Sequence, residues 1–219
     1  EKAGLLRYAD GGVLFVGHDP AGRAQSATRR ATDPADPVQK RDLRGSDKRY
    51  PPILPGDPTQ VWIVEGGADA LALHDIAKRS KRELPTVIVS GGAGVLGFLD
   101  MPHVQGILRK AKGVALAREN EKDKETQQRT DAAHQKQFQK ISDIVGKTSG
   151  CRVIQWSPKS DNVKDLAELN MKQLAEIERK RQAEIEKMEI LKNEEAERRR
   201  EQERPKQQAH RSVGYGPEL

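Results

Sequence analysis

Cysteine is nearly absent from this sequence, and so are long apolar runs. The single cysteine, Cys151, excludes an internal disulfide and a cysteine-rich zinc site, and a core position in a reducing compartment is its simplest interpretation. No stretch approaches the ~20 apolar residues that a membrane span requires, and no signal-peptide pattern opens the chain. We therefore expect a cytoplasmic protein without a membrane partner. Because the chain begins with Glu1, we also expect it to be a fragment of a longer polypeptide.

Several motifs that would assign a function class are also missing. The sequence has no Gly-rich loop followed by Lys-Ser/Thr, which argues against a helicase motor. The run 91–97 (GGAGVLG) is not G-x-G-x-x-G and has no acid at the right place downstream, so it predicts a tight strand-to-helix turn. The five histidines, at 18, 74, 103, 134 and 210, show no metal-ligand spacing.

The composition bounds the packed part of the chain. Only 35% of the residues are hydrophobic and 33% are charged, so we do not expect all 219 residues to share one core. The formal net charge of +6 is compatible with a nucleic-acid partner, but many other soluble proteins have a similar balance. Composition alone therefore leaves the function open.

Residues 1–60 are rich in Gly, Pro, Asp and Arg. Within them 12–17 (GVLFVG) predicts a strand, 19–22 (DPAG) predicts a tight turn, and 23–30 could pair back as a second strand. The stretch 31–58 contains six prolines and is typical of a loop. We expect a small β-containing, basic N-terminal segment.

Residues 61–170 alternate between strand and helix patterns. Strands are predicted at 61–65, 86–90, 113–117 and 152–156, and helices at 69–82, 101–111 and 125–147. Strands that are apolar throughout and separated by helices indicate a parallel sheet that is covered on both faces. The predicted fold class is therefore α/β, with a parallel four-stranded sheet.

A charged helix is predicted at 171–204. This stretch holds 10 Lys/Arg and 10 Glu, and several pairs have the favourable i,i+4 order. Its apolar residues form at most a thin stripe, which does not establish a coiled coil. A solvated helix or spacer and a partner-binding helix both remain open. Residues 205–219 are expected to be a disordered tail.

Acidic residues follow two of the predicted strands. Glu65 ends the first strand, and the carboxyl ends of parallel strands face the crevice where ligands bind. Asp69 lies near the start of the next helix, where capping and chemistry are equally good interpretations. Glu119 and Glu121, at i,i+2 after the third strand, project to the same side. Such close carboxylates repel, and a divalent cation such as Mg²⁺ or Mn²⁺ relieves the repulsion.

Two interpretations of Glu119 and Glu121 are therefore open. Glu119 and Glu121 could simply begin a charged loop, because further charges follow them. Their place opposite Glu65 in the same sheet favours a metal cradle made by all three.

Basic residues cluster in the N-terminal segment. Gly45 and Ser46 within the cluster would let backbone N–H groups approach a phosphate, and Tyr50 could stack on a base. A solvated basic loop is the alternative. The candidate nucleic-acid contacts are Arg29, Arg30, Lys40, Arg41, Arg44, Lys48 and Arg49.

Three runs carry a resemblance to the toprim domain of primases. VEGGADALAL (64–73) resembles the first toprim motif, and ENE (119–121) falls where that family carries Asp-x-Asp. NVKDLAE (162–168) resembles the Lys-Asp motif that follows the last toprim strand in many primases. Upstream, 13–23 and 41–50 are similar to the segment that precedes toprim in primase-like proteins of plasmids and phages. The resemblance spans roughly residues 5–170.

The resemblance implies a magnesium-dependent site. Glu65 would be the acid/base or a metal-linked carboxylate, and Glu119 and Glu121 would be metal ligands. Lys164 would hold a nucleotide phosphate and Asp165 a second metal, although the two could equally be an ordinary helix-start pair. The family pattern is not met at 119 and 121, where Glu replaces both Asp residues and its longer side chain would move the ion.

The resemblance implies a primase-like nucleotidyl transfer, in which nucleoside triphosphates are joined on single-stranded DNA. Such modules occur in plasmid replication or mobilisation proteins, joined to a relaxase or helicase, so other domains of a larger protein are expected partners. A metal-dependent toprim nuclease is one alternative. A catalytically degenerate toprim module that binds DNA or a partner within a conjugative relaxase is another.

Overall fold

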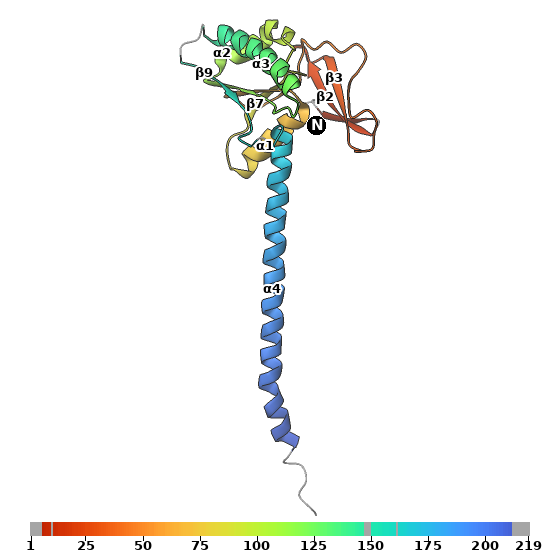
Figure 1. The fold of residues 1–219 in the computed structure, drawn as a ribbon, viewed down its shortest axis with the longest axis vertical. Helices are drawn as coiled ribbons and strands as arrows, with labels where there is room; N and C mark the ends of the chain where they lie inside the picture. The colour runs from red at the N-terminus through yellow and green to blue at the C-terminus, as the bar shows by residue number, and fades with distance from the viewer. Residues whose placement is uncertain (1–5, 10, 147–149, 161, 212–219) are drawn as a thin grey trace, which may run out of the picture. The chain divides into compact units, whose positions relative to one another are not determined.

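The computed structural model describes residues 6–9, 11–146, 150–160 and 162–211, and Figure 1 shows its fold. The chain divides into two compact units, residues 1–171 and residues 172–219. The first unit contains both β-sheets and three complete α-helices, and the second consists of the greater part of the last helix. The four zones expected from the sequence remain a prediction.

The N-terminal segment forms an antiparallel sheet. Its order is β1–β2–β3–β4, with β1 at Leu6–Ala9, β2 at Gly12–His18, β3 at Ala24–Ala31 and β4 at Lys40–Asp42. The two predicted strands are confirmed as β2 and β3, and the predicted turn closes with Gly22 N donating to Asp19 O at 2.9 Å. Strand β4 was expected to be loop, because three exposed charged residues carry no apolar pattern.

The second sheet has five strands in the order β5–β7–β6–β8–β9. They are β5 (Ile53–Leu54), β6 (Asp57–Val64), β7 (Pro85–Val89), β8 (Gly113–Ala117) and β9 (Arg152–Trp156). The four predicted strands are its parallel part, and β5 adds an antiparallel edge that the sequence did not predict. A two-residue strand between prolines is too short to show a period.

Helices cover both faces of this sheet, as expected. One face packs against η1 (Gly97–Asp100), α2 (Pro102–Lys110) and α3 (Lys124–Val145), through residues such as Phe98, Leu108 and Ile141. The other face packs against α1 (Gly67–Arg79) and the start of α4, through Leu73 and Leu166. Burial of these side chains is the main stabilising contribution, and it holds the carboxyl ends of β6 and β8 in fixed positions.

Helix α4 is longer than predicted, because it runs from Leu166 to Arg211. It begins earlier because Asp165 caps it: Asp165 Oδ1 accepts a hydrogen bond from Glu168 N at 2.8 Å. Residues 205–211, expected to be tail, are helical, since most of them are good helix formers; residues 212–219 lie outside the described residues. The apolar side chains at 174, 177, 185, 188 and 191 are exposed. None of the described helices is long and apolar enough to cross a membrane.

Candidate active-site cleft

A cleft with a volume of about 450 Å³ opens between the two sheets of the first unit. Its floor comes from the segments that follow β6 and β8, together with the starts of α1 and α4, and its wall comes from β2, β3 and β4. The cleft gathers all six predicted catalytic and metal-binding positions. These are Glu65, Asp69, Glu119, Glu121, Lys164 and Asp165.

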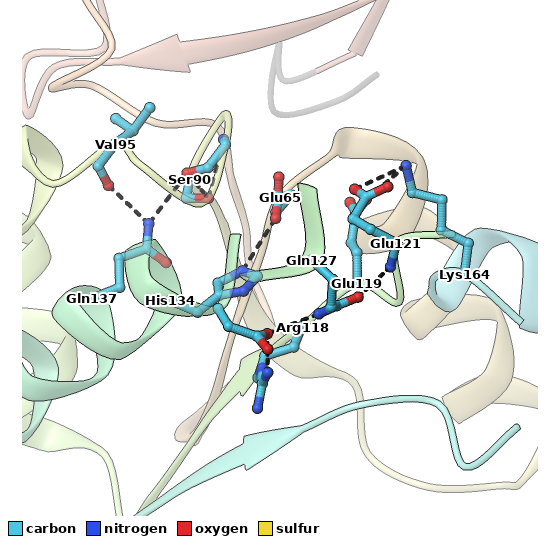
Figure 2. Close-up of polar contacts among 12 residues, drawn as sticks. Glu65, Ser90, Val95, Arg118, Glu119, Glu121, Gln127, His134, Gln137 and Lys164 are labelled. Carbon is cyan, nitrogen blue, oxygen red and sulfur yellow. Dashed lines mark hydrogen bonds and ion pairs between the residues drawn. The ribbon is translucent and has the colours of Figure 1, made fainter. Parts of the chain in front are cut away.

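Lys164 lies between the two glutamates that follow β8. Its Nζ is 3.3 Å from Oε2 of Glu119 and 3.3 Å from Oε1 of Glu121, as the dashed lines in Figure 2 show. Burial by itself would lower the pKa of Lys164, but the charges and hydrogen bonds of the two carboxylates outweigh it and raise that pKa. The ammonium is therefore firmly charged and neutralises part of the acidic floor.

Asn120 holds this arrangement in place. Its backbone N donates to Lys164 O at 2.8 Å, and its side-chain Nδ2 donates to Val163 O at 2.9 Å. On its other side the segment is fastened to α3, where Gln127 Oε1 accepts from Glu121 N at 2.5 Å. Sequence reasoning missed Asn120 and Gln127, because a side chain that bonds to a distant backbone leaves no local pattern.

The acids in the floor raise one another's pKa. Burial, and then the charges of Glu65 and Asp69, raise the pKa of Glu119 to about 7. Burial, and then the charge of Asp165, raise the pKa of Asp69 to about 6. The raised pKa values of these two carboxyls mean that their ionised forms are destabilised in the cleft. Carboxyls perturbed in this way are common at functional sites.

Asp69 and Asp165 both have structural roles as well. Asp69 lies in the first turn of its own helix α1, where the backbone of the N-cap residue Gly66 donates to its carboxylate, and its Oδ1 also accepts from Ala167 N, at 3.1 Å, in the first turn of α4. Asp165 caps α4 through its Oδ1. The same carboxylate would have to bind the second metal that the resemblance implies, so the two roles compete for its oxygens. Asp69 therefore contacts the first turns of both α1 and α4, and its predicted chemical role stays a prediction.

His134 is the clearest residue that sequence reasoning missed. It is 1% exposed, and its Nε2 lies 3.1 Å from Oε1 of Glu65, toward which Figure 2 shows it pointing. One turn later, Gln137 donates to Val95 O at 2.8 Å in the loop after β7. Both are fully buried. A signal was available, because His134 precedes the core residue Ile141 by seven residues, which is two turns of the same helix face.

The two glycines after Glu65 meet the N-terminal sheet. A Cβ placed on Gly67 would lie 2.2 Å from Cδ1 of Phe15, a buried residue of β2. A Cβ on Gly66 would lie 2.9 Å from Oδ2 of Asp69. An aromatic ring of the same chain therefore approaches the backbone closely at Gly67, and this contact brings the basic wall next to the acidic floor.

Strand pairing separates the predicted basic surface into two faces. Arg30 and Lys40 stand opposite each other in the β3–β4 register, and both line the cleft. Arg29 and Arg41 form the neighbouring pair, and successive residues of a strand point to opposite faces. Arg29 is buried and donates to Asp36 Oδ2 at 2.7 Å, so its charge is used within the fold.

The remaining basic candidates lie outside the acidic cleft. Lys48 pairs with Asp42 and Arg49 pairs with Asp47, each at 2.7 Å, and Arg44 is exposed. The ring of Tyr50, expected to be available to a base, already stacks on His103 with centroids 5.8 Å apart. Lys48 and Tyr50 line a neighbouring pocket that also includes Glu65. Contact of these basic side chains with nucleic acid stays a prediction.

The donor set of the cleft suits a hard cation, although the three glutamates do not form one cluster. Among the described residues, no three His, Cys, Asp or Glu side chains converge on a common point. Glu119 and Glu121 do converge, on the ammonium of Lys164. Mg²⁺ commonly binds through one or two carboxylates, with waters and substrate phosphates completing the shell. The pair therefore fits such an ion, whereas the predicted participation of Glu65 stays a prediction.

Comparison with known proteins shows a similarity of fold to solved structures. No family model matches the chain, and no curated protein is significantly similar to it. Among solved structures, the DnaG catalytic core is 17% identical with a TM-score of 0.52, and the match covers 82% of this chain and 57% of that one.

Two further structures match less closely. The DnaG primase catalytic domain bound to ssDNA is 18% identical, with a TM-score of 0.49 and coverage of 83% and 56% of the two chains. The E. coli primase catalytic core is 17% identical, with a TM-score of 0.47 and coverage of 78% and 54%. The chain thus spans little more than half of the structures it matches, and its fold is similar to that of a primase catalytic core.

Proposed function

We propose that the cleft catalyses metal-dependent, primase-like nucleotidyl transfer on single-stranded DNA. The observation that carries this function is the meeting of an acidic floor and a basic wall in one cleft. A nucleoside triphosphate bound with Mg²⁺ or Mn²⁺ needs carboxylates for the ion and cations for the phosphates, and the cleft holds both. The likeness of the fold to a primase catalytic core supports the same function.

Each group in the cleft has a role in this function. Glu119 and Glu121, with Glu65 nearby, would hold the metal ion, which when bound neutralises phosphate charge and orients the attacking hydroxyl. Arg30 and Lys40 bind the triphosphate from the opposite wall. Glu65, held by His134, would accept the proton of the 3′-hydroxyl as its oxygen bonds to the α-phosphorus of the incoming nucleotide and pyrophosphate leaves. Asp69 joins the floor to the start of α4 and keeps the acids in place.

The chain is proposed to act as a module of a larger replication or mobilisation protein. The match to the DnaG catalytic core, of which this chain covers 57%, supports this proposal. The long charged helix α4 suits a connector to further domains, such as a relaxase or helicase.

A degenerate, DNA-binding module is the second candidate, and one observation favours it. Glu119 and Glu121, which replace the usual pair of aspartates, are engaged by Lys164 rather than open to solvent. In that case the cleft would bind DNA or a partner without chemistry.

Labelled nucleotide incorporation on single-stranded DNA, with Mg²⁺ or Mn²⁺, distinguishes the candidates. The parent chain is compared with Glu65→Gln, with Glu119→Gln/Glu121→Gln, and with Glu83→Gln, an exposed carboxylate outside the cleft, as the matched control. We expect short products from the parent and the control but not from the two site variants. Metal-dependent cleavage of the template would indicate a nuclease. DNA binding with neither product would indicate the degenerate module.

A further inference from the structure

The ammonium of Lys164 is already where a cation shared by Glu119 and Glu121 would lie. It is equidistant from the two carboxylates, at 3.3 Å from each. The backbone on either side is tied down, by Asn120 and by the cap of α4. This ion pair is therefore a defined element of the floor, built by the chain itself.

A divalent ion and the ammonium cannot both use these oxygens, because like charges in contact repel strongly. The side chain of Lys164 is 42% exposed, and its four-carbon stem lets the ammonium move while the backbone stays fixed. Lys164 lines the same cleft as Arg30 and Lys40. An ammonium released from the glutamates would thus remain in the cleft and face the same space as these two cations.

We propose that Lys164 is a built-in counter-cation, which a divalent metal displaces from Glu119 and Glu121 and which then binds the triphosphate of the nucleotide. This exchange rests on the proposed function of the cleft. It makes nucleotide binding depend on the metal by two routes, the metal's own charge and the release of Lys164. It also offsets part of the negative charge of the paired glutamates while no metal is bound.

The first experiment measures Mn²⁺ affinity by the electron paramagnetic resonance signal of the free ion, at pH 8, on the full chain without nucleotide. The variant is Lys164→Gln. The matched control is Lys140→Gln, which removes a lysine paired with Asp100 on the far side of the sheet from α1. Removing a competitor that occupies the site about nine-tenths of the time tightens apparent affinity roughly tenfold. We expect this gain in Lys164→Gln and no change in the control.

Two more variants complete the metal measurement. Lys164→Arg keeps the charge, so its Mn²⁺ affinity should stay close to that of the parent chain. The double variant Glu119→Gln/Glu121→Gln should no longer bind Mn²⁺ at this site, whether residue 164 is Lys or Gln. Unchanged or weaker Mn²⁺ binding in Lys164→Gln would overturn the exchange alone. If Glu119→Gln/Glu121→Gln binds Mn²⁺ with the same affinity as the parent chain, the metal site of the proposed function is wrong, and the exchange is wrong with it.

The second experiment measures binding of a non-hydrolysable nucleoside triphosphate analogue at saturating Mn²⁺. Here Lys164→Gln should bind roughly tenfold more weakly than the parent chain, because a phosphate contact is lost. The two experiments thus predict effects of opposite sign from one substitution. A purely structural role for Lys164 would weaken both ligands together, and that result would overturn the exchange.

Discussion

His134, a fully buried residue of α3, lies with its Nε2 3.1 Å from Oε1 of Glu65 at the end of β6. Neither ring nitrogen of His134 makes a hydrogen bond of regular geometry within the described part of the chain. A buried polar group without such a bond destabilises a fold. A group kept at that cost beside a cleft carboxylate points to a role in function, namely to hold Glu65 in one orientation.

Replacing His134 with Leu should therefore separate activity from stability. We expect kcat for primer synthesis to fall by about 10- to 100-fold, because a misplaced carboxylate loses its alignment with the attacking hydroxyl. The melting temperature should stay equal or rise, since two buried nitrogens that lack a regular hydrogen bond are removed. His134→Gln, which retains a donor, should recover part of the loss. Full activity of the Leu variant would exclude this positioning role.

Replacing Glu119 with Gln should stabilise the metal-free protein at high pH. The pKa of Glu119 is raised from 4.5 to about 7 by burial and by its acidic neighbours. Below pH 4.5 the carboxyl is protonated in both the folded and the unfolded chain. Between pH 4.5 and 7 the unfolded chain ionises first, so this group lowers the free energy of unfolding as the pH rises.

We expect Glu119→Gln to raise the free energy of unfolding by about 2 kcal/mol at pH 8 and to leave it unchanged at pH 4. Thermal unfolding in the presence of a chelator measures both values. Glu83→Gln, at an exposed position, is the control and should have no effect at either pH. An equal gain at both pH values would show that the effect does not come from the charge of Glu119.

Replacing Gly67 with Ala should destabilise the protein through Phe15. The added Cβ would lie 2.2 Å from the ring, so the ring or the helix must shift, at about 1–3 kcal/mol. In a Phe15→Ala background the obstruction is gone, and the same substitution should cost much less. Urea unfolding of the parent, the two single variants and the double variant gives the interaction free energy between positions 15 and 67. If the two substitutions change the free energy of unfolding additively, Phe15 and residue 67 are not in contact.

Strand alternation predicts opposite outcomes for neighbouring arginines. Arg30→Gln and Lys40→Gln should each weaken nucleotide binding by about tenfold, because both side chains line the cleft. Arg41→Gln, on the other face of the same strand pair, should leave it unchanged. Arg29→Gln should lower stability instead, because it breaks a buried pair with Asp36. Equal losses from Arg30→Gln and Arg41→Gln would contradict this division.

Local sequence patterns were sufficient to predict the parallel strands, the helices between them and the acids at the strand ends. Apolar runs such as 61–65 and 113–117 are local signals, and the direction of a parallel strand places Glu65 and Glu119 at the same edge. The charged strand β4 and the two-residue strand β5 escaped prediction, because pairing partners rather than their own apolar pattern create them. The start of α4 at Leu166 agrees with the alternative of a helix-start pair at Lys164 and Asp165, since Asp165 caps the helix.

The identity of the side chains that contact one another in the cleft depends on the packing of the whole unit. Contacts between residues far apart in the chain brought His134 to Glu65, Lys164 to Glu119 and the ring of Phe15 to Gly67. Pairing of β3 with β4 turned Arg30 toward the cleft and Arg29 away from it, although the two are adjacent in sequence. Local periodicity reports which face of an element is buried, whereas the partner across that face is set by packing of the whole unit.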